Sequence, residues 1–274
     1  MHQWWVVARA MLLALMVQAC GSTPPVEPVP SSATLSPWRA RIVEAALGEW
    51  RAWGQLTVDG WPETLPRQVD PKLFERVLVY WSEVPEGEAV IRRHRHAHDE
   101  LMSSLAEAFW PAPVPEGLPA ISLWAYPAWS AAFVSHVMAR SGVPGFVFPR
   151  SSAHAFYVDA LLSHANWNPE QAAFLPHDPD EYAPKPGDLL CADRSGLPLL
   201  HWRERLYEAG QFRPMHCDIV VASAPGMVQA IGGNVLDAVV LRRFPADAQG
   251  RPLPPPPDKA PFLIVFENRL DAAP

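Results

Sequence analysis

Candidate strands gather in the last third of the chain, whereas the residues before them carry helical patterns. The short apolar segments lie at 188–192, 217–222, 227–231, 235–242 and 262–266. Pro225-Gly226 and Gly232-Gly233-Asn234 are turn signals between them. Residues 203–209 fit a short helical insertion, and 166–184 are predicted to form a loop. Helices followed by consecutive short strands are typical of an α+β fold with an antiparallel sheet.

The preceding segments have recognisable helix starts. Ser36 is a good N-cap residue and Pro37 a good first residue, which predicts a helix over 37–53. Ile42, Ala46 and Trp50 recur at intervals of four within it, as one helix face requires. Further helices are predicted at 71–81, 87–109, 129–142 and 152–163.

The N-terminus resembles a bacterial lipoprotein signal. Residues 4–17 are apolar apart from Arg9, too short a run for a spanning helix, and they lead into Ala19-Cys20-Gly21. In a lipobox the cysteine is lipidated and becomes the mature N-terminus, and Gly21 after it would direct the protein to the outer membrane. An ordinary secretory signal or a short anchor is the alternative.

These features predict three segments. Residues 1–19 are a lipoprotein signal peptide, and residues 20–36 are the lipidated Cys20 followed by a Pro/Ser-rich tether. Residues 37–274 form a single domain, long enough for a full hydrophobic core. We expect a lipid-anchored protein of the outer membrane that faces the periplasm.

The net charge and the number of cysteines indicate which partners to expect and whether a disulfide can form. The net charge is −7 and there is no basic patch, so nucleic-acid binding is not expected. Lipidation of Cys20 leaves Cys191 and Cys217, which lie in predicted strands that could be neighbours. A disulfide and a pair of buried thiols are both compatible with this placement, because the periplasm is oxidising but cross-strand geometry must be right.

Two residues at element starts suggest nucleophilic catalysis. Ser130 lies at the predicted start of helix 129–142, and His216 opens a predicted strand. A nucleophile needs a base within hydrogen-bond reach, and the base needs an orienting partner, for which Asn234 and Asp218 are candidates. Main-chain N–H groups at the helix start could hold an oxyanion. A helix N-cap is the alternative role for Ser130.

The block from Trp129 to Phe244 resembles the bacterial family DUF2272. The motifs that carry the resemblance are Pro127-Ala128-Trp129-Ser130-Ala131-Ala132-Phe133-Val134, Pro186-Gly187-Asp188-Leu189, His216-Cys217-Asp218-Ile219-Val220 and Gly232-Gly233-Asn234. That family is similar to the NlpC/P60 and CHAP cell-wall hydrolases. The resemblance implies a papain-like (NlpC/P60-like) α+β domain with helices packed on an antiparallel sheet. Those enzymes cleave peptide or amide bonds in peptidoglycan with a Cys–His pair and a third polar residue, roles that fall here on Ser130, His216 and Asn234.

The chain departs from those enzymes at the nucleophile. A thiol beside an imidazole ionises readily, whereas a serine must lose its proton during attack, with His216 as general base. One hypothesis is therefore a cofactor-free hydrolase of amide or peptide bonds, with peptidoglycan as its substrate. The other is a catalytically inactive domain that binds peptidoglycan stem peptides or a periplasmic protein. Cys191 and Cys217 are weaker candidates for a replacement nucleophile, since neither lies at a helix start.

Several neighbours of Ser130 are candidate substrate contacts. His154 lies where we expect this family to carry a histidine, and it could line the cleft or be structural. Trp124, Tyr126 and Trp129 directly precede Ser130 and could form a carbohydrate-stacking wall, with core packing as the alternative.

A histidine-rich segment invites a metal-site hypothesis. His94 and His98 would share a helix face, a spacing used by some zinc sites. No third ligand is evident and arginines surround them, so a solvated charged helix face is favoured and no metal site is predicted.

Overall fold

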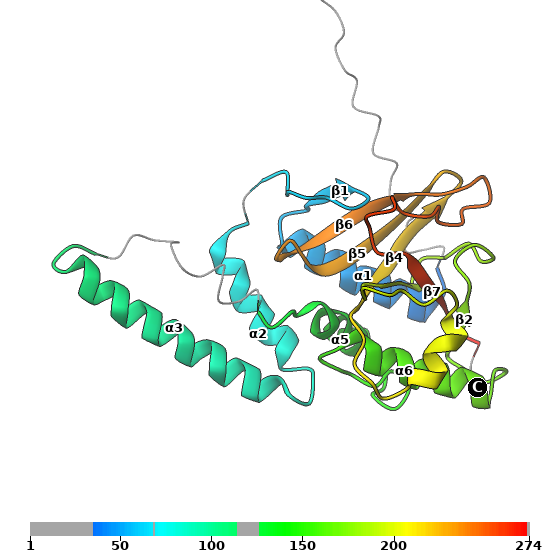
Figure 1. The fold of residues 1–274 in the computed structure, drawn as a ribbon, viewed down its shortest axis with the longest axis horizontal. Coiled ribbons are helices and arrows are strands. Elements are labelled where there is room, and N and C mark those ends of the chain that lie inside the picture. The colour runs from blue at the N-terminus through cyan, green and yellow to red at the C-terminus, as the bar shows by residue number, and fades with distance from the viewer. Residues whose placement is uncertain (1–34, 68, 114–125, 273–274) are drawn as a thin grey trace, which may run out of the picture.

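The computed structural model describes residues 35–67, 69–113 and 126–272 (Figure 1). Its helices, with η for 3-10 helices, are α1 (Pro37–Ala52), η2 (Pro71–Phe74), α2 (Glu75–Trp81), α3 (Gly87–Phe109), α5 (Ser130–Arg140), α6 (His154–Trp167) and η3 (Trp202–Glu208). Its strands are β1 (Thr57–Asp59), β2 (Phe174–His177), β3 (Leu189–Asp193), β4 (Met215–Ala224), β5 (Met227–Val235), β6 (Ala238–Pro245) and β7 (Phe262–Asn268). The predicted signal peptide, Cys20, most of the tether and Trp124 lie outside the described residues.

The strands form one seven-stranded sheet in the order β1-β6-β5-β4-β3-β7-β2. Six of the strands pair antiparallel, and β1 joins the edge parallel to β6. The predicted α+β class is therefore confirmed. The sheet is mixed, however, and the expectation of a wholly antiparallel sheet was wrong at that one edge.

The main helices cover one face of the sheet (Figure 1). Alternate residues of β4, namely Cys217, Ile219 and Val221, point into the large core on this side. Val220 points to the other face, where a smaller core is closed by loop residues that include Trp61 and Tyr182. Among the described helices, none is long and apolar enough to cross a membrane.

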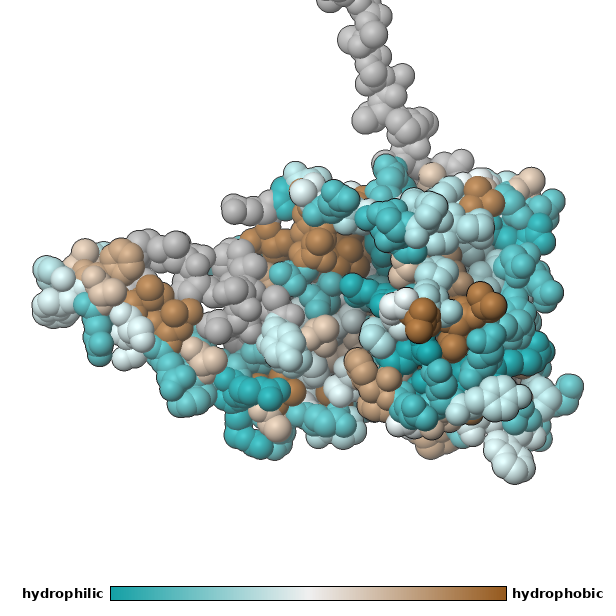
Figure 2. Space-filling view, in the orientation of Figure 1, coloured by the Kyte–Doolittle hydropathy of each residue, from teal (hydrophilic) through white to brown (hydrophobic). Residues whose placement is uncertain are grey.

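Helix α3 projects from the body of the fold. It packs mainly on α2, and only Gly87, Val90 and His94 of its described residues are buried. Figure 2 shows both hydrophilic and apolar side chains along the part that extends outward. The predicted solvated helix face therefore does not include His94, which is 4% exposed.

The predicted turn Gly232-Gly233-Asn234 is part of β5. The hairpin between β5 and β6 turns instead at Leu236 and Asp237, both of which have positive φ. The two glycines allow close packing rather than chain reversal: a Cβ on Gly233 would come within 2.5 Å of Phe133 in α5. This close approach brings the helix that begins at Ser130 down onto the sheet.

Two short strands were not predicted. The range 166–184 was expected to be a loop, but Phe174–His177 forms β2 and pairs with β7. Its proline and its short length give it no strand signal of its own, so its conformation depends on the neighbouring strand. The three residues of β1 form for the same reason, beside β6.

The pairing of β3 with β4 settles the state of the two cysteines. Cys191 lies directly opposite Cys217, with 4.0 Å between their Cα atoms, and the two form a disulfide. Both sulfurs are buried and bonded, so neither cysteine can serve as a replacement nucleophile.

Candidate functional site

Ser130 is the first residue of α5, and its hydroxyl faces a histidine. Trp129 occupies the N-cap position, and no side chain caps the helix. The Oγ atom of Ser130 lies 2.6 Å from Nε2 of His154. The helix-cap alternative for Ser130 therefore does not describe its side chain, which is 93% buried and committed to this contact.

His154 is the first residue of α6, and its second ring nitrogen contacts Tyr157 one turn further along the helix. Ser151 accepts from Ala153 N and donates its own N–H to Ser135 of α5, at 3.1 Å each. These bonds fix the start of α6 against α5. When His154 accepts the proton of Ser130 at Nε2, Nδ1 carries the other ring proton and donates it to the Tyr157 oxygen.

A second imidazole belongs to a charged assembly. His216 Nε2 lies 3.2 Å from Oδ1 of Asp218, and the other carboxylate oxygen of Asp218 pairs with Arg242 of β6. All three side chains are at least nine-tenths buried. Gly232 makes this possible, because a Cβ there would collide with Asp218 Oδ1.

The His154 assembly, with Ser130 and Tyr157, and the His216 assembly, with Asp218 and Arg242, are adjacent but line different pockets. The ring centroids of His154 and His216 are 5.3 Å apart. Ser130 and His154 line a pocket of about 620 Å³, whereas His216 and Asn234 line one of about 580 Å³. Strand alternation explains the separation: Cys217 points toward the helices, so His216 and Asp218 point to the other face.

The predicted Ser130–His216–Asn234 arrangement is not assembled in the described part of the chain. Within the described part of the chain, Ser130 bonds to His154 and no hydrogen bond joins it to His216. Of the two predicted orienting residues, Asp218 contacts His216. Asn234 shares a pocket with His216, and the structure records no side-chain hydrogen bond for it among the described residues.

Burial sets the protonation of both imidazoles. Desolvation, followed by the neighbouring His216, lowers the pKa of His154 well below its usual value. Desolvation also lowers the pKa of His216, although Asp218 opposes this. Burial opposes ionisation of Asp218, but Arg242 and His216 outweigh it and hold the Asp218 pKa at about 2. At neutral pH the site thus contains two neutral imidazoles beside one carboxylate.

Trp129 does not face the pocket. Its side chain is fully buried and stacks on Trp53 at 5.4 Å between ring centroids, so the prediction that it contacts substrate was wrong. Tyr126 is 81% exposed and lines the Ser130 pocket. Sequence analysis missed Tyr157 and Arg242. Tyr157 follows His154 at the i+3 spacing of one helix face, a signal that was available.

The described residues hold no group of three or more side chains suited to a metal ion. The site contains a buried hydroxyl, two imidazoles and a carboxylate. Such a set can transfer a proton from a serine, and main-chain N–H groups at a helix start can stabilise a developing negative charge.

Comparison with family models places the chain in a bacterial family. The model described as "Uncharacterized protein conserved in bacteria (DUF2272)" matches residues 69–260. The chain belongs to this family, as the motifs around Ser130 and His216 predicted. The matched range includes both histidine assemblies and most of the sheet. Comparison with curated proteins gave no match, and comparison with solved structures gave none either.

Proposed function

We propose that this chain is a hydrolase of amide or peptide bonds, with a papain-like arrangement in which Ser130 replaces the usual cysteine. The observation that carries the proposal is the 2.6 Å contact between Ser130 Oγ and His154 Nε2 in the wall of a pocket. A hydroxyl bonded to a neutral buried imidazole is the arrangement that general-base activation of a serine requires.

In the proposed reaction Ser130 Oγ attacks the substrate carbonyl carbon while His154 Nε2 takes the hydroxyl proton. The carbonyl oxygen becomes an oxyanion near the main-chain N–H groups that begin α5. His154 then returns the proton to the leaving amine as the C–N bond breaks, which leaves an acyl ester on Ser130. Water, deprotonated by the same imidazole, hydrolyses this ester and restores the serine.

Asp218 has a supporting role in this mechanism. A proton on His154 is disfavoured by burial, and the negative charge of Asp218 opposes that effect. The charge of Asp218 therefore favours the imidazolium that forms during attack, whereas His216 opposes it, and neither residue is hydrogen-bonded to Ser130 in the resting structure. The sequence predicts His216 as the base, and this assignment remains the alternative. Replacing each histidine in turn distinguishes the two assignments.

The proposed location is the periplasmic side of the outer membrane, with peptidoglycan as the substrate. The lipobox at Cys20 supports a lipid anchor. The disulfide between Cys191 and Cys217 supports an oxidising compartment, because structural disulfides are rare in the reducing cytosol.

Labelling with a serine-directed fluorophosphonate tests the nucleophile. We expect the chain to be labelled once, Ser130→Ala to abolish the label and Ser130→Ala to release no product from peptidoglycan. Ser152→Ala is the matched control, since Ser152 lines the same pocket and should leave labelling intact. Release of no product by either the chain or Ser130→Ala, with no labelling, would favour the alternative of a binding domain for stem peptides or a periplasmic protein. Identical products from both would remove Ser130 as the nucleophile.

A further inference from the structure

Arg194 follows β3 and lines both pockets of the site. Its guanidinium makes no hydrogen bond or ion pair with any described residue, although its backbone N–H bonds to Pro214 O at 2.8 Å. Arg194 thus combines an anchored backbone with a side chain that is unpaired among the described residues, in the pocket that also holds Ser130.

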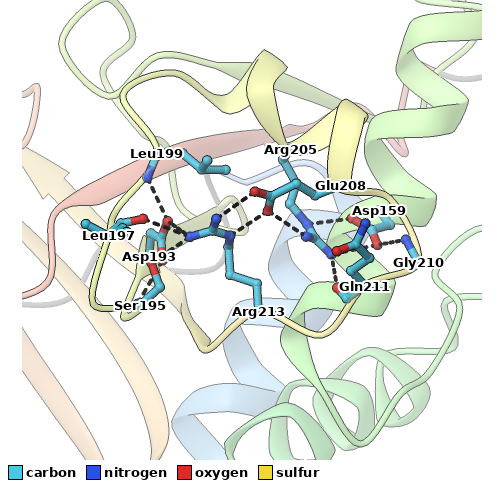
Figure 3. A network of polar contacts seen from close by, with 10 residues as sticks. All are labelled: Asp159, Asp193, Ser195, Leu197, Leu199, Arg205, Glu208, Gly210, Gln211 and Arg213. Carbon is cyan, nitrogen blue, oxygen red and sulfur yellow. Dashed lines mark hydrogen bonds and ion pairs between the residues drawn. The ribbon is translucent and has the colours of Figure 1, made fainter.

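The segment around Arg194 is held by a polar network (Figure 3). Asp193 is fully buried and accepts from the backbone N–H groups of Ser195 and Leu199, at 2.9 Å each. Arg213 completes the network with bonds to Asp193 and Glu208. The residues on either side of Arg194 are thus fixed, so its position does not depend on a mobile loop.

The same network attaches η3 and the residues around it to α6, the helix that carries His154. Arg205 is fully buried and bonds to Asp159 of α6 at 2.8 Å, and Gly210 N bonds to Asp159 at 2.7 Å (Figure 3). Because η3 and α6 are joined in this way, Arg194 and His154 are parts of one connected structure.

The charge balance of the pockets singles out Arg194. In the larger pocket Arg213 is neutralised by Asp193 and Glu208, which leaves Arg93 and Arg194 against Glu86. In the other pocket Arg242 is paired with Asp218, and Lys259 with Asp258. Arg194 is therefore an uncompensated positive charge at the position that both pockets share.

We propose that Arg194 binds a carboxylate of the substrate beside the bond that Ser130 attacks, an inference that rests on the proposed function. Arginine suits this role because its planar fork binds a carboxylate through two parallel hydrogen bonds. Tyr126, Phe156 and Phe212 line the larger pocket and are exposed, so they offer an apolar surface for the adjoining side chain. The substrate class is an acylated amino acid or peptide with a free carboxylate next to an apolar group.

The test is a binding measurement on Ser130→Ala, which removes turnover. N-acetylphenylalanine and N-acetylphenylalaninamide differ only in the carboxylate, and calorimetry gives the affinity of each. We expect the carboxylate form to bind on the order of tenfold more tightly. Adding Arg194→Gln should remove this preference. Adding Arg203→Gln, the same charge change at an exposed arginine over Trp202, should keep it.

Equal affinity for the two compounds, binding of neither, or a preference that survives Arg194→Gln would each overturn the inference. The measurement is independent of catalysis, so the two proposals can fail separately. A carboxylate preference that depends on Arg194, without labelling of Ser130, leaves Arg194 as the anchor of a binding site and removes the hydrolase. Labelling of Ser130 without that preference keeps the hydrolase and removes the role of Arg194.

Discussion

The two histidine assemblies are 5.3 Å apart but are built in opposite ways. His154 contacts the hydroxyls of Ser130 and Tyr157, so its hydrogen-bond partners among the described residues are neutral. His216 contacts the carboxylate of Asp218, which in turn is paired with Arg242. The first assembly thus contains a nucleophile and lacks a charged orienting group, whereas the second contains the charged group and lacks a nucleophile.

This difference indicates a division of labour. A tyrosine hydroxyl can hold an imidazole in one tautomer, but it cannot stabilise the positive charge that appears when the imidazole accepts a proton. The carboxylate that can do so is in the neighbouring assembly, where Arg242 keeps it ionised. In the proposed mechanism the first assembly holds the nucleophile, and Asp218 of the second supplies a negative charge that favours a proton on His154.

The largest expected effect is the loss of ester hydrolysis when His154 and His216 are replaced one at a time. His154→Ala removes the group in contact with Ser130, so we expect kcat/KM for a generic ester to fall by roughly 10²–10⁴-fold. His216→Ala should change kcat/KM by no more than about tenfold, since His216 is not hydrogen-bonded to Ser130 and acts only through the electrostatic surroundings of His154. Ester hydrolysis and the rate of fluorophosphonate labelling measure both. A larger loss in His216→Ala would reverse the roles and make His216 the base, as sequence analysis predicted.

Breaking the buried ion pair of the charged assembly should lower the stability of the fold more than breaking a surface ion pair. Arg242→Ala leaves Asp218 buried without its cation, and we expect the free energy of unfolding to fall by about 3–5 kcal/mol. Arg243→Ala is the matched control on the same strand: Arg243 pairs with Asp59, whose side chain is 78% exposed, so its loss should cost under about 1 kcal/mol. Urea unfolding measures both. Equal losses would mean that the buried pair is no more important than the surface one.

Much of the fold could be predicted because local signals and tertiary structure agree. The start of α1 at Pro37 and the strands around Cys191 and Ile219 follow from capping residues and apolar runs. The error at Gly232 and Gly233 has a physical reason. Paired glycines mark either a turn or a close approach of backbone to a neighbour, and only the position of Phe133 shows which applies.

Several candidate residues could be named from the starts of predicted elements, but their hydrogen-bond partners could not be predicted. Ser130 and His216 were named from the starts of predicted elements, and Asp218 as a candidate orienting partner for His216. The contact with His154 depends on how α6 packs against α5 through Ser135 and Ser151, which local pattern does not report. The same limit applies to the disulfide, whose formation depends on the register between β3 and β4.

The smallest expected effect is a loss of stability in mild acid, caused by the two imidazoles that are neutral in the folded chain. In the folded chain burial lowers the pKa of both His154 and His216 below the value of about 6.5 that an unfolded chain has. Below pH 6.5 the unfolded state therefore binds protons that the folded state does not, and the free energy of unfolding declines as the pH falls. Each imidazole contributes at most about 1.4 kcal/mol per pH unit. Asp218 acts in a separate pH window, because its stabilisation is present above the ordinary carboxyl pKa and is lost as the pH falls toward about 2.

Urea unfolding between pH 7 and pH 5 should show a shallower decline of the free energy of unfolding in His154→Gln than in the unchanged chain. His96→Gln removes an exposed imidazole and serves as the control. If His154→Gln declines as steeply as the unchanged chain, His154 is charged in the folded state and cannot accept a proton from Ser130.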